Sequence, residues 1–591
     1  MNPYSYIWLY NNIYINNINI KNNIKNNIKN NIYIYMKKVF NILGQKHPLV
    51  SESLSGVNTP GRNKPTPQVS PGPTPPVDEI IEVDNLVIGA GIGGTYLSAR
   101  LANFEPTKSL LIVDKLSDYG GLQISSQIPG TNTYIDLGPV RFFPSIHPRV
   151  AYLAEKYKLP LVEYLPDSNN QVYYLRDKLF TSTDVFPDSD SVYNIRDDEK
   201  GINPFVTLEN NLKKFFPDVE QLADFDYRIE LFKDVFYSNA VFQPLAQQDM
   251  SQENWERIED ILGYSDIFSV KGNFIINSLE TLSLANRVAT QYRFENGYSS
   301  LTKTIAQQNY LNKITFDSLN QNTFDIFKYN TLFNTAVLNV EFSNSKKMWK
   351  VEIGSVSVNS PEQINYQPLS IKTIYAKKIY STLPLFYLDN IHKFPSQYLN
   401  LCENSFVNFQ VLRVYLKFET DWMTEMGIGF GKSITTLNGA QLIHYADKVL
   451  MFYAFNRKCS KLYNFLPNNI QIQKEMIEPN DSTKLFIDEC ITIIKSSYGV
   501  SSLPEINGVS YATWIQPVSF FSGRNLQTLK SESLYDILMN IMFPYGKEGN
   551  FYVLTNSASF NNGWNEGSLE IVDFYLNLIY NQPLFGETLI K

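Results

Sequence analysis

Cysteine and histidine are both scarce in this sequence of 591 residues. It contains four histidines and three cysteines, Cys402, Cys459 and Cys490. An odd number of cysteines, far apart in the chain, does not fit a disulfide framework and favours reduced thiols. No histidine lies near another histidine or a cysteine, so we expect no structural zinc site and predict no metal.

Long apolar runs and a basic charge balance are absent as well. No run of about eighteen apolar residues occurs, so no membrane span is expected. The formal net charge is −7, which argues against a general nucleic-acid surface because phosphates attract basic patches. The first residues do not have the basic and then apolar pattern of a secretory signal. An intracellular, cytoplasmic location is therefore the default expectation.

The first part of the sequence has low complexity. Asn, Ile, Tyr and Lys dominate residues 1–35, and Lys-Asn-Asn-Ile is repeated from Lys21. We expect a disordered tail over 1–56, with Met36 as an alternative start, and an extended Pro-rich linker over 57–78. Very AT-rich genomes, as in some protists and large DNA viruses, give such a composition; a viral source would add the virion as a location. The tail is a candidate contact for an assembly partner.

A strand, a glycine turn and a helix follow the linker. Residues 83–88 are an apolar run, and apolar residues then recur at helical spacing. The glycines between them are Gly89, Gly91, Gly93 and Gly94. A second apolar strand, 110–113, ends in Asp114, twenty residues past Gly94, where a ribose partner is expected. This pattern predicts dinucleotide binding at the helix N-terminus. The alternative is a glycine-rich turn in another α/β unit.

The rest of the chain mixes helical and strand patterns. Helices are expected over 147–158, 208–216, 252–262, 299–308 and from 568, and strands over 329–342, 374–382, 406–418, 441–455 and 551–554. The strands at 406–418 and 441–455 have the alternation of an antiparallel sheet. No internal repeat is evident.

These residues resemble the flavin-containing amine oxidases, most closely the L-amino-acid oxidase branch. The resemblance covers roughly residues 80–590, in patches. The family's N-terminal pattern occurs here as the glycine turn, Asp114, Gly120-Gly121 and Asp136-Leu-Gly138. It implies FAD as cofactor, bound by Gly89, Gly91, Gly93, Gly94, Asp114, Gly121, Gly138, Pro139, Val140, Arg141, Val337, Asn556 and Trp564.

The resemblance also implies substrate-binding residues. Leu137-Gly-Pro-Val-Arg141 is similar to a segment whose arginine holds the substrate carboxylate, and a guanidinium is the natural bidentate partner of a carboxylate. Arg141 as a structural arginine is the alternative. Tyr445, or His444 because the register is uncertain by one, corresponds to a tyrosine that touches the same carboxylate. Trp564 corresponds to the aromatic wall of the site, with a purely core role as the alternative. Trp514 resembles another segment that closes over the flavin.

Five positions depart from the family pattern. Leu122 replaces the arginine of Gly-Gly-Arg, and Asp118 replaces a second arginine; both family cations lie near the pyrophosphate. Thr555-Asn556 replaces a Gly-Glu pair, in which the glutamate bonds the ribityl chain. Arg413, our candidate catalytic residue, falls where the family has a lysine that holds a water at flavin N5. An arginine can hold water, but it cannot act as a neutral amine base.

We therefore predict an α/β fold with two domains. A Rossmann-like FAD-binding domain comprises 79–143, 290–388 and 536–591, and an interleaved α+β substrate domain with an antiparallel sheet comprises 144–289 and 389–535. The predicted function is oxidation of an L-amino acid or other primary amine. The resemblance implies hydride transfer from the α-carbon to flavin N5 and reoxidation by O2 to H2O2. The alternatives are a catalytically weak or inactive structural or interaction protein, and a polyamine oxidase or desaturase-type flavoenzyme.

Overall fold

The computed structural model describes residues 80–164, 170–181, 185–215, 230, 249–262, 290–358, 367–437, 440–455, 462–466, 472–521, 533–559, 561 and 563–582. The chain divides into two units, Met1–Pro76 and Val77–Lys591, and all described residues belong to the second. The tail predicted over 1–56 and the linker predicted over 57–78 lie outside the described residues.

The first sheet has a parallel core. Its strands are β1 (Ile81–Ile88), β2 (Leu110–Val113), β9 (Asn312–Ile314), β10 (Tyr329–Leu332), β13 (Ser370–Ser381) and β20 (Phe551–Val553). β1 lies at the centre, with β2, β10 and β9 to one side and β13 to the other, and β20 pairs in parallel with β13. All four residues of β2 are buried, as is usual for a parallel strand covered on both faces. β2 and β13 pair with opposite edges of β1. The sheet therefore has a topological switch point at the end of β1.

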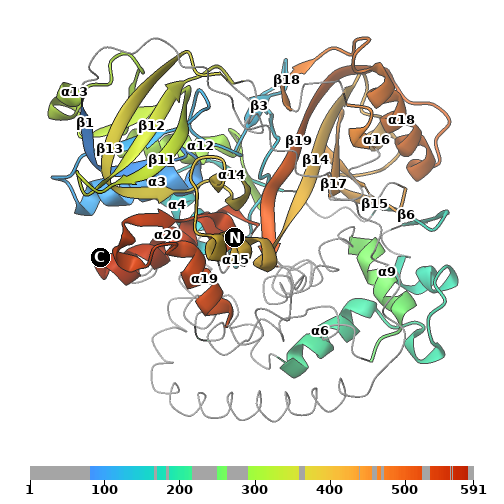
Figure 1. Ribbon diagram of the computed structural model, residues 1–591. Helices are drawn as coiled ribbons and strands as arrows, with labels where there is room; N and C mark the ends of the chain where they lie inside the picture. The colour runs from blue at the N-terminus through green and yellow to red at the C-terminus, as the bar shows by residue number, and fades with distance from the viewer. Residues whose placement is uncertain are drawn as a thin grey trace. The chain divides into compact units, whose positions relative to one another are not determined.

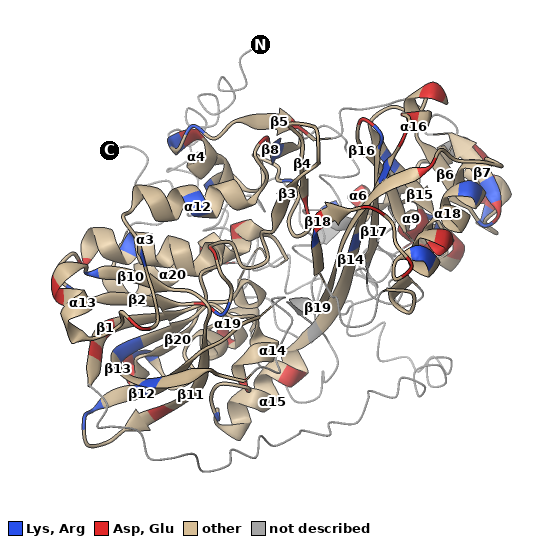
Figure 2. Ribbon diagram, turned by 90° about the horizontal axis from the view of Figure 1, so that it is seen from above, with Lys and Arg blue, Asp and Glu red and all other residues tan. Residues whose placement is uncertain are grey.

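Helices cover one side of this sheet. α3 (Ile92–Phe104) packs against β1 and β2, and α12 (Ser299–Gln308) and α20 (Asn565–Tyr580) pack against α3. Figure 2 shows α3 and α12 on one side of the parallel strands and the hairpin of β11 (Thr335–Ser343) and β12 (Met348–Ser355) on the opposite side. The hairpin extends the sheet by antiparallel pairing of β12 with β13.

The second sheet is mainly antiparallel, and its long strands β14 and β19 lie side by side in Figure 1. Its order is β18 (Ile472–Ile477), β19 (Ile506–Phe521), β14 (Phe406–Phe418), β17 (Val449–Phe455), β16 (Gln441–Ala446), β15 (Gly431–Thr435), β6 (Val172–Leu175) and β7 (Lys178–Thr181). One face of β14 packs into a separate core with α18 (Lys484–Tyr498), through Leu412, Val414 and Leu416. Side chains alternate between the faces of a strand, so residues 411 and 413 point away from that core.

The remaining helices that concern the site are α4 (Pro148–Lys156), α14 (Leu385–Leu388), α15 (Ser396–Ser405) and α19 (Leu534–Met542). Between α4 and α14 in the chain lie α6 (Pro204–Phe215) and α9 (Gln252–Leu262). Two predicted elements were wrong in outline. The strand predicted over 329–342 is two strands, β10 and β11, because Asn334 has a φ of 50° and turns the chain. The segment predicted over 441–455 is the hairpin of β16 and β17, which turns at Lys448, whose φ is 63°.

The predicted fold class is confirmed: a Rossmann-like α/β sheet is combined with a mainly antiparallel sheet. Strands of the first sheet come from three separate stretches of the chain, as interleaved domains require, while the exact domain boundaries stay predictions. In the described ranges, no helix is both long enough and apolar enough to cross a membrane.

Candidate functional site

A cavity of about 370 Å³ lies where the two sheets face each other. Gly89 follows β1, Asp114 follows β2, Thr382 follows β13 and Leu554 follows β20, and all four residues line it. The cavity therefore occupies the crevice at the carboxyl ends of the parallel strands, which is the usual ligand position in such sheets. Of the residues predicted to bind the cofactor, every one except Gly94 lines the cavity. Their contact with a cofactor stays a prediction.

The glycine turn is shaped by close backbone contacts. Gly89 has a φ of 108°, a conformation that side chains rarely adopt. Gly94 does not reach the cavity, but a Cβ there would lie 1.9 Å from the main-chain oxygen of Gly89. Gly94 is thus required for the packing of α3 on β1. Gly91 precedes α3, and no side chain caps this helix. The N–H groups of its first turn therefore face the cavity without a side-chain partner.

Asp114 ties the glycine turn to the end of β2. Its two carboxylate oxygens accept hydrogen bonds from the main-chain N–H of Ala90, at 2.6 Å, and of Leu116, at 2.8 Å. Burial raises the pKa of Asp114 above its ordinary value, and the two N–H bonds oppose this rise. The predicted ribose partner therefore lines the cavity and also fixes the turn that would face the phosphates.

The second glycine turn carries two of the departures from the family pattern. Leu122 lines the cavity, but Asp118 does not. Asp118 pairs with the ammonium groups of Lys303 at 2.9 Å and Lys313 at 2.7 Å. Burial alone would raise the pKa of Asp118, but the bonds from both lysines lower it below its ordinary value. The two lysines therefore offset the negative charge that Asp118 brings to this turn.

The segment from Leu137 to Arg141 forms one wall of the cavity. A Cβ on Gly138 would lie 1.7 Å from the main-chain oxygen of Leu122, so only glycine allows this wall to approach the second glycine turn. Arg141 lies over the rings of Phe143 and Tyr164, with its guanidinium carbon 5.7 Å and 5.6 Å from the ring centres. These rings orient its guanidinium at the cavity wall, where the sequence predicted a carboxylate contact.

Asp136, the last residue of β4 (Tyr134–Asp136), directly precedes this wall and fixes it through hydrogen bonds. Its Oδ1 accepts hydrogen bonds from the Ser125 hydroxyl at 2.6 Å and the Tyr298 N–H at 2.8 Å. Its main-chain oxygen accepts from the Tyr415 hydroxyl at 2.7 Å and from Arg413 Nη1 at 3.2 Å. Burial raises the pKa of Asp136 to about 6, against the hydrogen bonds from Ser125 and Tyr298.

The second sheet contributes the opposite wall. Four of its strands line the cavity, through Val411 and Arg413 of β14, Gln441 and Ile443 of β16, Met451 and Tyr453 of β17, and Trp514 of β19. The guanidinium carbon of Arg413 lies 4.9 Å from the ring centre of Tyr453, its partner in the ladder. The indole N–H of Trp514 donates to the main-chain oxygen of Leu137 at 2.7 Å, which joins the two walls.

Tyr445 and its alternate His444 do not line the cavity. Tyr445 shares a face of β16 with Gln441 and Ile443, but its hydroxyl donates to the main-chain oxygen of Tyr134 at 2.8 Å. His444 points to the other face, where its ring lies 4.5 Å from that of Phe430. The position of neither residue supports the predicted carboxylate contact. Gln441 is the polar residue of this strand at the cavity.

The C-terminal segment closes the cavity through Thr555, Asn556 and Trp564. The Thr555 hydroxyl accepts a hydrogen bond from the N–H of Ser557, so this side chain begins the short turn after β20. The ring of Trp564 lies 4.5 Å from that of His147 and 5.8 Å from that of Phe143, centre to centre. Trp564 therefore both packs on its neighbours and forms cavity wall. Val337, at the start of β11, also lines the cavity.

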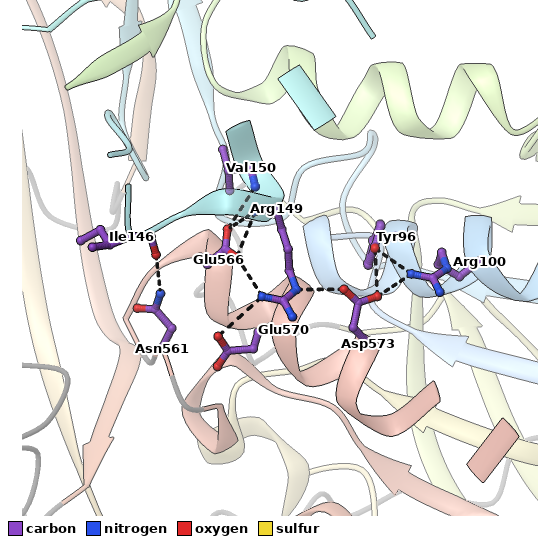
Figure 3. A network of polar contacts seen from close by, with 9 residues as sticks. All are labelled: Tyr96, Arg100, Ile146, Arg149, Val150, Asn561, Glu566, Glu570 and Asp573. Carbon is purple, nitrogen blue, oxygen red and sulfur yellow. Dashed lines mark hydrogen bonds and ion pairs between the residues drawn. The ribbon is translucent and has the colours of Figure 1, made fainter. Parts of the chain in front are cut away.

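A buried network of charges holds α20, the helix that begins directly after Trp564, against α3 and α4 (Figure 3). Arg149 of α4 pairs with Glu566 at 3.1 Å, Glu570 at 3.8 Å and Asp573 at 2.8 Å. Arg100 of α3 pairs with Asp573 from the other side, at 2.5 Å. Burial raises the pKa of Glu566 above its ordinary value, although Arg149 opposes this. The network joins α3, α4 and α20, and the first residues of α3 and α20 line the cavity.

Several cavity residues were not found from the sequence, among them Lys115, Tyr164, Thr382, Tyr387 and Gln441. The ammonium group of Lys115 lies 5.4 Å from the ring centre of Tyr387, a residue of α14. Lys115 had a signal, because it follows the acid at a strand end, whereas the others depend on which strands become neighbours.

Comparisons with known proteins agree with this architecture. Residues 87–157 match the family described as NAD(P)-binding Rossmann-like domain. Wild-type putrescine oxidase bound to putrescine superposes with a TM-score of 0.55 at 12% identity, over 85% of this chain and 100% of that chain. A double mutant of the same enzyme gives 0.54 at 14% identity, with the same coverage. The resemblance found in the sequence is therefore confirmed at the level of the fold.

A relative by sequence is the uncharacterized protein R188 of Acanthamoeba polyphaga mimivirus. It is 21% identical over 529 residues, which cover 85% of this chain and 94% of that protein. The similarity thus extends over both sheets and the segments between them.

Proposed function

We propose that this chain, whose fold is that of the flavin-containing amine oxidases, is an FAD-dependent oxidase of an L-amino acid or other primary amine. One observation carries the proposal. The glycine turn and Asp114 line the same cavity as Arg141, Arg413 and Trp564. A dinucleotide site and a polar, aromatic substrate site are thus continuous, as oxidation of a substrate by a bound dinucleotide requires.

The residues present fit FAD. The uncapped first turn of α3 offers N–H groups and a positive dipole end to a diphosphate. Asp114 would accept from a ribose hydroxyl, and Val337 would contact the adenine. Leu122 and Thr555 line the cavity without closing it, since the lining continues past both to Trp564. When bound, the flavin would supply hydride acceptance from the substrate and reoxidation by dioxygen.

The chain's own residues would bind and orient the substrate. Arg141 holds the carboxylate through two charge-assisted bonds, which places the α-carbon at a fixed distance from the wall. Trp564 and Trp514 exclude water from the reacting end. Arg413, at the position of the family's lysine, supplies a permanent positive charge and N–H donors there. It has no neutral form at physiological pH with which to take a proton.

A flavin absorbance spectrum of the purified protein tests the proposal first. Protein that is yellow, and is bleached anaerobically by amino acids or amines, would support it. Colourless protein that takes up no added FAD would reject it and leave a structural or interaction protein, the alternative motivated by Leu122 and Thr555.

Arg141→Lys tests which substrates are used. The variant should raise KM for carboxylated substrates about 10- to 100-fold, because a lysine loses the bidentate geometry, and change KM for plain amines little. An equal effect on both classes would count against the carboxylate clamp and favour a polyamine oxidase.

A further inference from the structure

Arg413 presents part of its guanidinium to the cavity. Its Nη1 donates to the main-chain oxygen of Asp136, and its Nε is buried without a hydrogen-bond partner among the described residues. The side chain is only partly buried and lines the cavity. The ring of Tyr453 supports the guanidinium from one side. Its remaining N–H groups are thus positioned to bind a group inside the cavity.

A guanidinium at this position acts as a fixed charge. It stays protonated and accepts no hydrogen bond, so its partner has to be an acceptor, best an anion. The charge of Asp136 interacts with that of Arg413, but Asp136 accepts its hydrogen bonds from Ser125 and Tyr298 and does not line the cavity. The charge that Arg413 presents to the cavity is therefore available to a group bound there.

No acidic residue that lines the cavity, among those described, pairs with Arg413. Among the described residues that line it, Asp114 is the one acid, and it stands at the dinucleotide end with both oxygens bonded to main-chain N–H groups. Arg141 also lines the cavity, and Arg413 donates to the main-chain oxygen of Asp136, five residues before Arg141. A diamine would bring a second cation to two arginines, which is unfavourable at short range in a site that excludes water. A neutral side chain would leave the charge of Arg413 unused.

We propose, on the basis of the function proposed above, that the substrate carries a second anionic group and that Arg413 binds it. The substrate class is then an amino acid with an acidic side chain, held by Arg141 at the α-carboxylate and by Arg413 at the side-chain carboxylate. Arg413 is the residue that selects acidic over neutral side chains.

The experiment compares isosteres on the FAD-loaded full chain. Glutamate and glutamine have the same shape and differ in charge, so their ratio isolates the electrostatic contact. The same titration uses glutarate, a dicarboxylate that cannot be oxidised at an amine, and follows the perturbation of flavin absorbance. Wild-type protein should prefer glutamate, or aspartate over asparagine, by about 10- to 100-fold in kcat/KM, the range of a charge-assisted contact, and should bind glutarate.

Arg413→Gln is the matched variant, because it keeps a donor and removes the charge. It should bring the ratio of glutamate to glutamine close to one and abolish glutarate binding. Arg141→Lys is the control, and it should weaken glutamate and glutamine alike. Equal use of both substrates by wild type, or a preference that survives in Arg413→Gln, would overturn the inference while oxidase activity on any amino acid upholds the proposed function. Protein that binds no flavin would overturn both.

Discussion

Asn556 holds the turn that ends at Trp564. Its Oδ1 accepts from the N–H of Gly563 at 2.7 Å, and its Nδ2 donates to the main-chain oxygen of Trp564. The amide that was expected to bond the ribityl chain thus also sets the position of the tryptophan wall. The family's glutamate could not make both contacts when ionised, because a carboxylate has no donor for the main-chain oxygen.

Removing this amide should loosen the tryptophan wall. Asn556→Ala loses both contacts and should lower the free energy of unfolding by about 1–3 kcal/mol. The flavin should become more accessible to iodide in a fluorescence-quenching measurement. Asn556→Asp keeps the acceptor for Gly563. Its free energy of unfolding and its iodide quenching should therefore lie between those of Asn556→Ala and of wild type. Equal quenching in all three proteins would contradict a role for this amide in closing the site.

The glycine turn offers a pair of variants that separate folding from cofactor binding. A Cβ at Gly91 would meet its nearest neighbours only at 3.9 Å, whereas a Cβ at Gly94 would lie 1.9 Å from the main-chain oxygen of Gly89. Gly91→Ala should therefore fold normally and bind FAD more weakly, because its methyl group enters the cavity.

Gly94→Ala should lose stability as well, by at least about 1–3 kcal/mol, because α3 must shift away from β1. Thermal unfolding of the cofactor-free proteins, combined with FAD titration, distinguishes the two variants. A melting temperature lowered equally by both substitutions would show that Gly91 has a packing role too.

The buried carboxyl group of Asp136 should make stability depend on pH. Burial raises its pKa to about 6, from an ordinary 3.8. The folded protein then keeps a proton between these pH values that the unfolded chain has released, so this group's contribution falls as pH rises from about 4 to 6. Its full size is at most about 3 kcal/mol.

Asp136→Asn keeps an oxygen for Ser125 and Tyr298 and cannot titrate. The difference in unfolding free energy, wild type minus variant, should therefore decrease between pH 4 and pH 6.5 and then level off. A difference that increases over this range would mean that the carboxyl group is stabilised in its ionised form.

The stability of the protein should depend on Arg149, the central cation of the buried charge network on α20. Arg149 is 2% exposed and faces three buried carboxyl groups. Arg149→Met leaves them without their main counter-charge and should cost about 3–5 kcal/mol.

Lys350→Met is the control, since Lys350 pairs with Glu341 and Glu352 at the surface, and such pairs contribute about 0–1 kcal/mol. Denaturant unfolding measures both. A similar small effect for Arg149→Met would mean that the carboxyl groups become neutral at little cost.

The sequence predicted the cavity residues around the glycine turn better than those on the second sheet. Asp114 was found because the helix between two neighbouring strands fixes the distance from the glycine turn to the end of the second strand. Thr382 was missed, although the strand before it was predicted, because its place beside β1 depends on a pairing between residues almost 300 positions apart. The lysines that pair with Asp118 were missed for the same reason, since they lie on α12 and β9.

Tyr445 shows a different limit. Its face of β16 follows from alternation, and the structure places Gln441 and Ile443 on the same face. How far along the strand the cavity extends depends on the bulge between His444 and Ala446 and on the contact with Tyr134. Neither has a local signal in the sequence.

The network in Figure 3 also bears on how the protein is made. It connects residues 96–100 and 149 to residues 566–573, and the wall at 554–568 closes the cavity. A nascent chain that has emerged only as far as β19 has its glycine turn but lacks the cavity wall from Leu554 to Ser568 and the partners of Arg149. We therefore expect the chain to bind the cofactor firmly only after α20 has left the ribosome. The incomplete chains that precede this stage are the ones that we expect to depend on chaperones.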